Sequence, residues 1–344
     1  MTGGVRDNGE APGTLGVLEV LEPGLLSTVQ DSGRTGYEQL GVPHAGACDR
    51  WGLAVANVLL GNAVGAAGLE MTLVGPVLRA RRACAIGLGG ADLGAVVERT
   101  GVRLAPGTTH TLRAGDVLRF PGGTHGMRGY LALPGGIDVP PVLGSRSTYV
   151  PARLGGLHGR PLETGDVLAE ALPTHEEIGR RVWPDRASLE PGRDPVLRVV
   201  EGPDAGDLPD VLQALLGVRW VIDQGSDRAG VRLLPGDEVT IPPTGQLISR
   251  PVTWGAIQVP PSGAPIILQA DHQTVGGYAV AAVVITADLP VLAQLRPGGT
   301  VAFRRVSVAD AVAALRDRSE AFRHAAARAS RDSLWHDLWL NTAG

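Results

Sequence analysis

The sequence of 344 residues contains no lysine, so all 31 of its basic residues are arginine. A Walker A loop places a lysine on the phosphates of a nucleotide, and Schiff-base catalysis uses a lysine amine. The chain is therefore predicted to be neither a P-loop NTPase nor a Schiff-base enzyme. Biotin is attached to proteins through the same amine, so covalent biotin on this chain is also excluded.

Cysteine and long apolar runs are scarce as well. The two cysteines, Cys48 and Cys84, are too few for a disulfide framework or a metal knuckle. The longest clean apolar run, residues 279–285, is far too short to cross a bilayer. Residues 1–14 lack the basic and apolar regions of a signal peptide and are predicted to form a disordered tail. We expect a cytoplasmic protein with no membrane partner.

Charge of one sign is also lacking. The formal net charge is −4, and arginines and acids are mixed along the chain, so no basic stripe is available for nucleic acid. The eight histidines are scattered, without an H-x-H or H-E-x-x-H pair. A metal site is therefore not expected.

Glycine and proline are abundant, with 49 and 26 residues, and they separate short runs rich in Val, Leu and Ile. This pattern is typical of many short strands joined by tight turns. Glycine supplies the positive φ that such turns need. A Gly-Asp or Gly-Gly turn opens four predicted strands, in residues 114–120, 164–170, 235–241 and 297–303. The chain is predicted to be mainly β with a few helices.

A helix is predicted over residues 49–61, where apolar residues recur near 3.6 spacing between Asp49, a favourable N-cap, and Gly61, a favourable stop. Ser307 and Asp310 form a capping-box pattern at the start of an Ala/Arg-rich stretch. Shorter helices are predicted at 207–217 and 287–298, and a C-terminal helical segment at 307–344.

A weak internal repeat suggests two related halves. The stretch "DSGRTGYEQLG" (31–41) is similar to "GSDRAGVRLLPG" (225–236), and each follows a predicted strand. The repeat puts Arg34 and Arg228 in corresponding places. Residues 171–195, which are rich in Glu, Pro and Arg, are the predicted linker between the halves.

The densest polar signal lies between two apolar runs, in "LQADHQTVGGY" (268–278). An unpaired polar group in a core costs about 1–3 kcal/mol, so this stretch is either a satisfied structural turn or the floor of a site. Its paired glycines would let the backbone approach a ligand. Amides and a carboxylate suit a small substrate with an amide or urea group. The candidates here are Gln258, Gln269, Asp271, Gln273, Thr274, Gly276, Gly277 and Tyr278.

Three other motifs carry weaker signals. "GSRST" (144–148) offers hydroxyls and the Arg146 guanidinium to a carboxylate or phosphate, although a self-satisfied turn is the commoner outcome. Cys48 immediately precedes a predicted helix, and a position at a helix N-terminus lowers the pKa of a thiol. A buried, inert thiol is nevertheless the favoured interpretation. "GLGGADLG" (87–94) has Asp92 where a dinucleotide loop needs glycine, which favours a simple turn.

Longer stretches resemble a known family. They include "PGLLSTVQDSGRTGYEQLGVPHAGACDR", "LALPGGIDVPPVLGSRST", "SDRAGVRL" and "GAIQVPPSGAPIILQADHQTVGGY". The family is the biotin-dependent carboxyltransferase-like family once called allophanate hydrolase subunit 2, and the resemblance runs from about residue 16 to 306. This family includes the KipA-like C subunit of ATP-dependent 5-oxoprolinase and the carboxyltransferase region of urea carboxylase.

The resemblance implies two cyclophilin-like β-barrel domains in tandem, at 15–170 and 196–306, followed by the C-terminal helix. It implies two partners, the KipI-like B subunit of 5-oxoprolinase and its A subunit. It also implies ATP as a requirement of the complex, and a metal-independent opening of 5-oxoproline to glutamate. Two alternatives stay open. The chain would transfer carboxyl groups to urea or a similar amide from biotin on another chain, or it would be a non-enzymatic regulatory partner.

The implied roles fall on the polar stretch. Asp271 is expected to act as general base or hydrogen-bond acceptor, Gln258 and Gln273 to orient the amide, and Tyr278 to wall the pocket. Further substrate-binding candidates are Arg34, Tyr37, His44, Arg146, Arg228, Gln269, Thr274, Gly276 and Gly277. Relatives usually have Met at the position of Cys48 and an acid at the position of Arg250, so this chain departs from the pattern at both.

Overall fold

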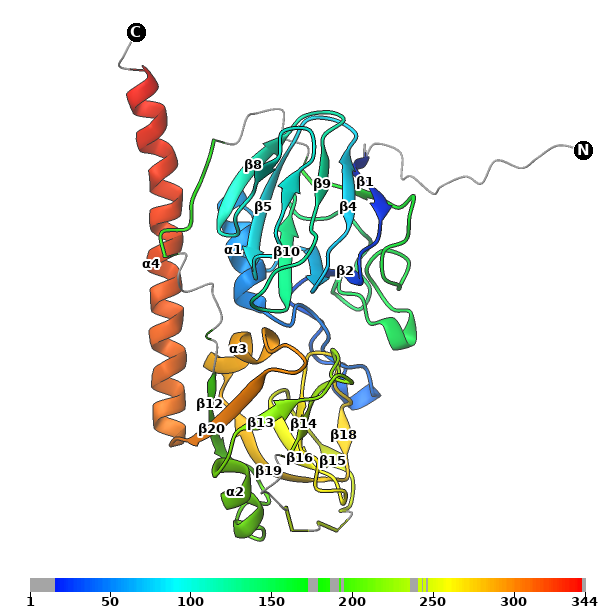
Figure 1. Ribbon diagram of the computed structural model, residues 1–344, viewed down its shortest axis with the longest axis vertical. Coiled ribbons are helices and arrows are strands. Elements are labelled where there is room, and N and C mark those ends of the chain that lie inside the picture. The colour runs from blue at the N-terminus through cyan, green and yellow to red at the C-terminus, as the bar shows by residue number, and fades with distance from the viewer. Residues whose placement is uncertain are drawn as a thin grey trace, which may run out of the picture.

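The computed structural model describes residues 16–172, 179–185, 192, 195–235, 241–242, 244–245 and 247–341. Strands dominate, and they gather into two lobes, one above the other in Figure 1. The first lobe contains β1 to β11 and the second lobe β12 to β20. The predicted tail and much of the predicted linker lie outside the described residues. The mainly β fold with a C-terminal helix is confirmed.

The first lobe consists of two facing sheets. Val20 and Leu78 of one sheet meet Leu69, Ile86 and Leu131 of the other in a single apolar core. One sheet has the order β11-β1-β4-β9-β6-β7 and the other the order β2-β3-β10-β5-β8. The strands are β1 (Gly16–Glu22), β2 (Leu26–Gln30), β3 (Gly68–Thr72), β4 (Val77–Ala80), β5 (Cys84–Gly90), β6 (Val96–Val97), β7 (Val102–Arg103), β8 (Thr108–Leu112), β9 (Val117–Arg119), β10 (Arg128–Ala132) and β11 (Val167–Ala169).

The second lobe closes into a barrel of order β12-β19-β16-β17-β14-β13-β20, in which the parallel pair β12 and β20 completes the ring. Leu197, Trp220, Ile257 and Val301 are fully buried inside it. The strands are β12 (Val196–Glu201), β13 (Trp220–Ile222), β14 (Gly230–Leu234), β16 (Ala256–Val259), β17 (Ile266–Leu268), β19 (Ala279–Val284) and β20 (Thr300–Arg305). Beside it, β15 (Arg250–Pro251) pairs with β18 (Val275–Gly276).

Helix α1 (Arg50–Leu60) begins and ends, and helix α4 (Val308–Asn341) begins, where their capping residues predict. In α1, the Asp49 side chain accepts from the backbone N–H of Gly52, and Gly61 closes the helix in the left-handed conformation. The reciprocal bonds of Ser307 and Asp310 open α4. The shorter helix predicted at 207–217 is found as α2 (Pro209–Leu216). The helix predicted at 287–298 is shorter than expected: the 3-10 turn η4 (Thr286–Asp288) leads into α3 (Leu289–Ala293), which ends where Gln294 leaves the helical conformation.

Turn glycines also behave as predicted. β9, β11 and β20 follow turns in which Gly115, Gly165 and Gly298 have φ of +83°, +93° and +79°. The fourth predicted strand, at 235–241, lies almost wholly outside the described residues. The "GLGGADLG" glycines serve packing, because a Cβ at Gly87 would lie 2.3 Å from the carbonyl oxygen of Ala56 in α1. These glycines let α1 lie close against β5.

Helix α4 runs beside both lobes in Figure 1. Arg318 donates from Nη1 to the carbonyl oxygen of Ala287 in the second lobe at 3.1 Å, and its guanidinium lies 5.2 Å from the ring centre of Trp51 in the first lobe. The Phe322 ring packs on Trp51 and on Trp183, at 5.0 and 5.1 Å between ring centres. The helix therefore braces the lobes against each other, and Trp183 of the predicted linker belongs to this packing.

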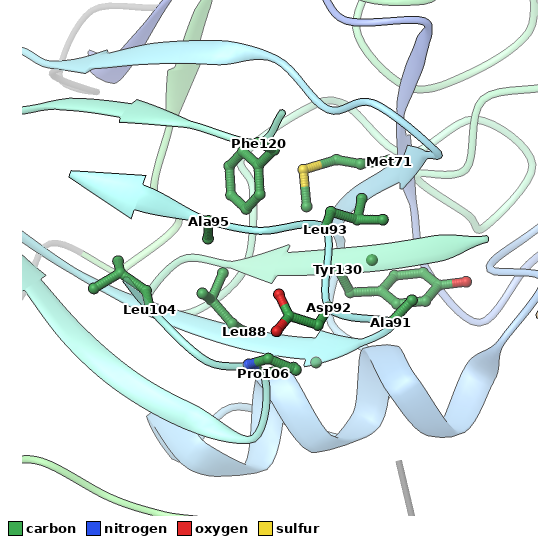
Figure 2. Close-up of a pocket in the computed structure, with 12 residues that line it drawn as sticks. Met71, Leu88, Ala91, Asp92, Leu93, Ala95, Leu104, Pro106, Phe120 and Tyr130 are labelled. Carbon is green, nitrogen blue, oxygen red and sulfur yellow. The ribbon is translucent and has the colours of Figure 1, made fainter. Parts of the chain in front are cut away.

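A void of about 10 Å³ lies in the first lobe. It is lined mainly by apolar side chains such as Met71, Leu88 and Phe120 (Figure 2). A space of this size holds at most about one water molecule, so it is not a ligand site. The ring of Tyr130 lines the void, and its hydroxyl points away from it and donates to Glu70 at 2.7 Å. That bond leads to the junction between the lobes.

Candidate functional site

The lobes meet around Arg228, which is 6% exposed and extends from the second lobe into the first. Its Nε and Nη2 donate to the two carboxylate oxygens of Asp271 at 2.8 and 2.9 Å. Nη2 also donates to the carbonyl oxygen of Gly46 at 2.8 Å. Nη1 contacts the carboxylate of Glu70, and the Sγ of Cys48 lies 3.3 Å from it. One guanidinium thus joins acids from both lobes.

Glu70, on β3, is 1% exposed and has its own set of partners. Besides Arg228, it accepts from the Tyr130 hydroxyl at 2.7 Å and from the backbone N–H of Cys48 at 2.8 Å. Burial alone would raise the pKa of Glu70, but the charges of Arg228 and Arg128 outweigh burial and lower the pKa below its ordinary value. The acid is therefore held as a carboxylate in the interior.

A second buried contact lies beside the first. The Gln294 Oε1 accepts from the backbone N–H groups of Met127 and Arg128, both at 2.9 Å, and its Nε2 donates to Asp49 at 2.8 Å. Arg128 in turn donates to the carbonyl oxygen of Ala293 at 3.0 Å. α3 lies on the side of the second lobe that faces the first, so these bonds fix the two lobes in one orientation (Figure 1).

A cleft of about 560 Å³ opens in the second lobe next to this junction. Ala229, the neighbour of Arg228 in sequence, lines one side of it. Its polar lining includes Asp227, Arg232, Gln258, Ser262, Gln273 and Tyr278. The volume falls within the range of small-molecule sites, and both apolar and polar side chains form the wall.

Gln258 is the buried polar group of the cleft wall, at 1% exposed. Its Oε1 accepts from Gln273 Nε2 at 3.0 Å, but its own Nε2 has no hydrogen-bond partner among the described residues. A buried amide donor without a partner costs free energy, and an acceptor on a bound molecule would relieve that cost. The cleft wall therefore contains one unpartnered donor, which lies beneath the surface beside Gly276.

The sequence of this chain matches the family model of the carboxyltransferase domain, subdomains A and B, over residues 40–305. This chain belongs to the carboxyltransferase domain family. It is 34% identical to the C subunit of 5-oxoprolinase from Escherichia coli (strain K12), over 91% of this chain and 98% of that protein.

Two solved structures extend the comparison. The crystal structure of TTHA0988 is 38% identical with a TM-score of 0.77, over 86% of this chain and 56% of that one. The Kluyveromyces lactis urea carboxylase is 30% identical with a TM-score of 0.80, over 96% of this chain. This carboxyltransferase domain protein thus spans little more than half of the former and 30% of the latter.

The predicted anion loop of this carboxyltransferase domain protein is satisfied by its own acid. Asp31 accepts from the Ser145 and Ser147 hydroxyls and, at 2.6 Å, from the backbone N–H of Arg146. The Arg146 Nε donates to the carbonyl oxygen of Val139 at 2.8 Å. These contacts favour the self-satisfied turn over a phosphate or carboxylate site.

Arg34 and Arg228 follow β2 and β13, as the repeat predicted, and the structure shows that both are buried. Arg34 donates from Nη2 to the carbonyl oxygen of Ser147 at 2.6 Å, whereas its Nε and Nη1 have no partner among the described residues. Burial lowers the pKa of Arg34, and the charges of Asp31 and Asp271 offset part of that. Arg34 does not line the cleft.

His44 and Tyr37 lie in the loop that leads from Arg34 to α1. The His44 ring contacts the Arg50 guanidinium at 3.0 Å, and both burial and this cation lower the His44 pKa, so the ring is neutral at neutral pH. The backbone oxygen of Tyr37 closes the turn η1 (Glu38–Leu40). Neither residue lines the cleft.

Gln269 supports the lobe junction. It is fully buried, and its Oε1 accepts from Trp254 Nε1 at 3.2 Å. The centre of the Trp254 ring lies 4.8 Å from the guanidinium of Arg50, which belongs to the other lobe. The amide therefore orients an aromatic side chain that makes a cation–π contact across the junction.

The predicted glycines of the polar stretch leave room for neighbouring protein groups. A Cβ at Gly276 would lie 2.4 Å from Gln258 Nε2, and one at Gly277 would lie 2.9 Å from the carbonyl oxygen of Leu247. The carbonyl oxygen of Thr274 accepts from the backbone N–H of Val252 at 3.1 Å. Together they hold the segment that carries Gln273 and Tyr278 beside the cleft.

The two departures from the family pattern have structural partners. The Cys48 thiol is buried, and burial raises its pKa to about 12 against the opposing charges of Arg128 and Arg228. A protonated thiol is a poor nucleophile, which supports the inert interpretation. Arg250 pairs with the carboxylate of Asp204, whose Oδ2 also accepts from the backbone N–H of Val280.

Sequence reasoning missed Glu70, Arg128, Tyr130 and Gln294, which form the first-lobe side and the second contact of the junction. Glu70 sits alone in the apolar run "GLEMTL", the same signal that marked Asp271. Among the described residues, no group of three or more His, Cys, Asp or Glu side chains is placed to hold a metal. In that same part of the chain, no helix has the length and apolarity to span a bilayer.

Proposed function

We propose that this chain is a component of an ATP-dependent 5-oxoprolinase, which opens 5-oxoproline to glutamate together with the A and B subunits of that enzyme. The observation that carries the proposal is the match to the C subunit of a 5-oxoprolinase, which covers 91% of this chain and 98% of that protein. The similarity to urea carboxylase, by contrast, covers a minor part of that protein. This chain thus matches the 5-oxoprolinase C subunit over nearly all of that protein, and urea carboxylase over 30% of its chain.

The cleft is the proposed substrate site. Gln258 Nε2 would donate to the lactam carbonyl oxygen, while Gln273 holds the other end of the Gln258 amide and Tyr278 borders the mouth. Gln273 lies two residues from Asp271, whose two oxygens are occupied by Arg228. We therefore assign Asp271 to positioning this segment, and its role as general base stays a prediction.

ATP is proposed as a substrate of the assembled complex. This chain lacks the lysine of a Walker A loop and the lysine that carries biotin, so neither activity is assigned to it alone. Its proposed contribution is to bind the amide in a fixed orientation within the complex.

The test is reconstitution with the A and B subunits. The expected result is 5-oxoproline-dependent ATP hydrolysis with stoichiometric glutamate, which disappears when this chain is omitted. Full activity without the chain would refute the proposal and favour a regulatory partner. A matched Gln258→Leu complex should assemble normally but turn over 5-oxoproline roughly 10²-fold more slowly, because the buried donor is lost.

The second candidate is carboxyl transfer to urea or a similar amide, with biotin on another chain. It is favoured by the urea carboxylase structure, which matches 96% of this chain. Bicarbonate- and urea-dependent ATP hydrolysis that avidin inhibits would establish it and exclude the oxoprolinase proposal.

A further inference from the structure

The cleft wall contains a cation in addition to the Gln258 amide. Arg232, on β14, lines the cleft, and its backbone is tied down because its N–H donates to Ser226 Oγ at 3.0 Å and its carbonyl accepts from Asp223 at 2.9 Å. Its side chain is exposed and makes no ion pair or hydrogen bond with a described residue. The guanidinium is thus available to a ligand.

Four other arginines of the second lobe pair with acids. Arg198 forms a fork with Asp288, with Nη2 2.6 Å from the carboxylate, and Arg305 pairs with Glu201 at 2.7 Å. Arg228 and Arg250 are also paired with acids. Arg232 differs from them because it faces the cleft rather than a protein carboxylate.

The acids on the same wall are partly committed to the backbone. Asp227 Oδ1 accepts from the N–H groups of Ala229 and Gly230 at 2.7 and 3.0 Å, and Asp223 Oδ1 accepts from Gly225 at 2.7 Å. These carboxylates repel a free anion. A ligand carboxylate therefore gains affinity only where it reaches the guanidinium of Arg232.

We infer that Arg232 selects the substrate by its carboxylate, so that the cleft prefers a carboxylate-bearing lactam to a neutral amide. Gln258 Nε2 would donate a hydrogen bond to the ring carbonyl oxygen, and the Arg232 guanidinium would bind the carboxylate. This arrangement requires one donor and one cation on the same wall, and both residues line the cleft. Guanidinium and carboxylate form charge-assisted, bidentate hydrogen bonds, and a ligand without the carboxylate forgoes them. This inference rests on the proposed function for the identity of the lactam.

The experiment compares 5-oxoproline with 2-pyrrolidinone, the same lactam without its carboxylate. Binding to the full chain is measured by titration calorimetry, and KM is measured on the reconstituted complex. The wild-type chain should bind 5-oxoproline roughly tenfold more tightly than 2-pyrrolidinone, as expected for one solvent-exposed charge-assisted contact. Arg232→Gln should lower the affinity for 5-oxoproline to that for 2-pyrrolidinone and leave the latter unchanged.

Arg304→Gln is the matched control. Arg304 is likewise exposed and lies on β20, which does not line the cleft, so the same loss of charge should change neither affinity. Gln258→Leu should weaken both lactams. Melting temperatures of all three variants report whether the barrel is intact.

The outcomes separate this inference from the proposed function. Equal affinities of Arg232→Gln and wild type for 5-oxoproline, or no binding of either lactam to chain or complex, would overturn the inference. A chain that binds 5-oxoproline through Arg232 within a complex that does not hydrolyse it would overturn the proposed function and leave the inference standing.

Discussion

Asp271 shows what one residue in a sequence reveals and what it conceals. A lone acid between two apolar strands had to be paired or functional, and the same reasoning applies to Glu70. The partner could not be predicted, because Arg228 is 43 residues from Asp271 and 158 from Glu70. Apolar neighbours in the sequence indicate that a charged residue is buried, whereas only the tertiary fold determines which opposite charge it pairs with.

Asp271→Asn tests this pairing. The variant keeps the shape of the side chain but leaves the buried guanidinium of Arg228 with one acid fewer. Breaking a buried ion pair costs about 3–5 kcal/mol, so the free energy of unfolding in urea should fall by that amount. Catalysis per folded complex should stay within a few-fold. Unchanged stability with a loss of roughly 10²–10⁴ in turnover would instead establish Asp271 as the general base.

The two cysteines give a second test at this scale. Both thiols are buried, and burial raises the pKa of each to about 12. A thiol reagent at about pH 8 should therefore titrate neither thiol in the native chain and both in urea. Because the unfolded thiols ionise near their ordinary pKa of 9.0, stability from them is complete below that pH and declines as the pH rises towards 12. Rapid native labelling of Cys48 would contradict this.

Secondary-structure elements were the level that local sequence predicted best. The ends of α1 follow from Asp49 and Gly61, and the start of α4 from Ser307 and Asp310, because capping involves residues a few positions apart. The glycines of β5 show the limit of local reasoning. These glycines allow α1 to pack closely against β5, and a local sequence pattern does not predict that contact.

Gly89→Ala tests that packing. A Cβ at position 89 would lie 2.1 Å from the carbonyl oxygen of Gly52, so α1 must shift and the free energy of unfolding should fall by about 1–3 kcal/mol. Gly206→Ala is the control, since nothing lies within 4 Å of its Cβ. The two variants are compared by urea unfolding. Equal stability of both would show that α1 does not need close approach to β5.

At the scale of the whole molecule, the pH dependence of the lobe junction can be measured. The Glu70 pKa is lower in the folded chain than its ordinary value of 4.5, so its charged form contributes stability above that pH, and the contribution disappears as the pH falls through the folded pKa. Burial raises the Asp49 pKa at the same junction, which acts in the opposite direction.

The variant Glu70→Gln isolates the first effect. Wild type should be the more stable at neutral pH, and the difference in free energy of unfolding should shrink as the pH falls below 4.5 and through the lower pKa of the folded chain. Urea unfolding at several pH values measures it. A difference that stays constant as the pH falls below 4.5 would mean that the Glu70 charge does not stabilise the junction.

The fold class, the helices and the repeat-related arginines were accessible to sequence reasoning, whereas the junction was not. The polar stretch was identified, but its members divide between two places. Gln258, Gln273 and Tyr278 line the cleft, and Asp271 and Gln269 hold the lobes together. Neighbouring residues of a turn can point to opposite sides of it. Their positions in the sequence therefore do not predict which of them line the cleft and which lie at the junction.

The contact between Glu70 and Arg228 also has a consequence for synthesis on the ribosome. Translation proceeds at roughly 5–20 residues per second, so the partner of Glu70 emerges roughly 8–30 s after Glu70 itself. During that interval Glu70 has the countercharge of Arg128 from its own lobe but not that of Arg228, at a surface that later becomes interior. The nascent chain thus carries an incompletely paired acid at least until residue 228 leaves the exit tunnel.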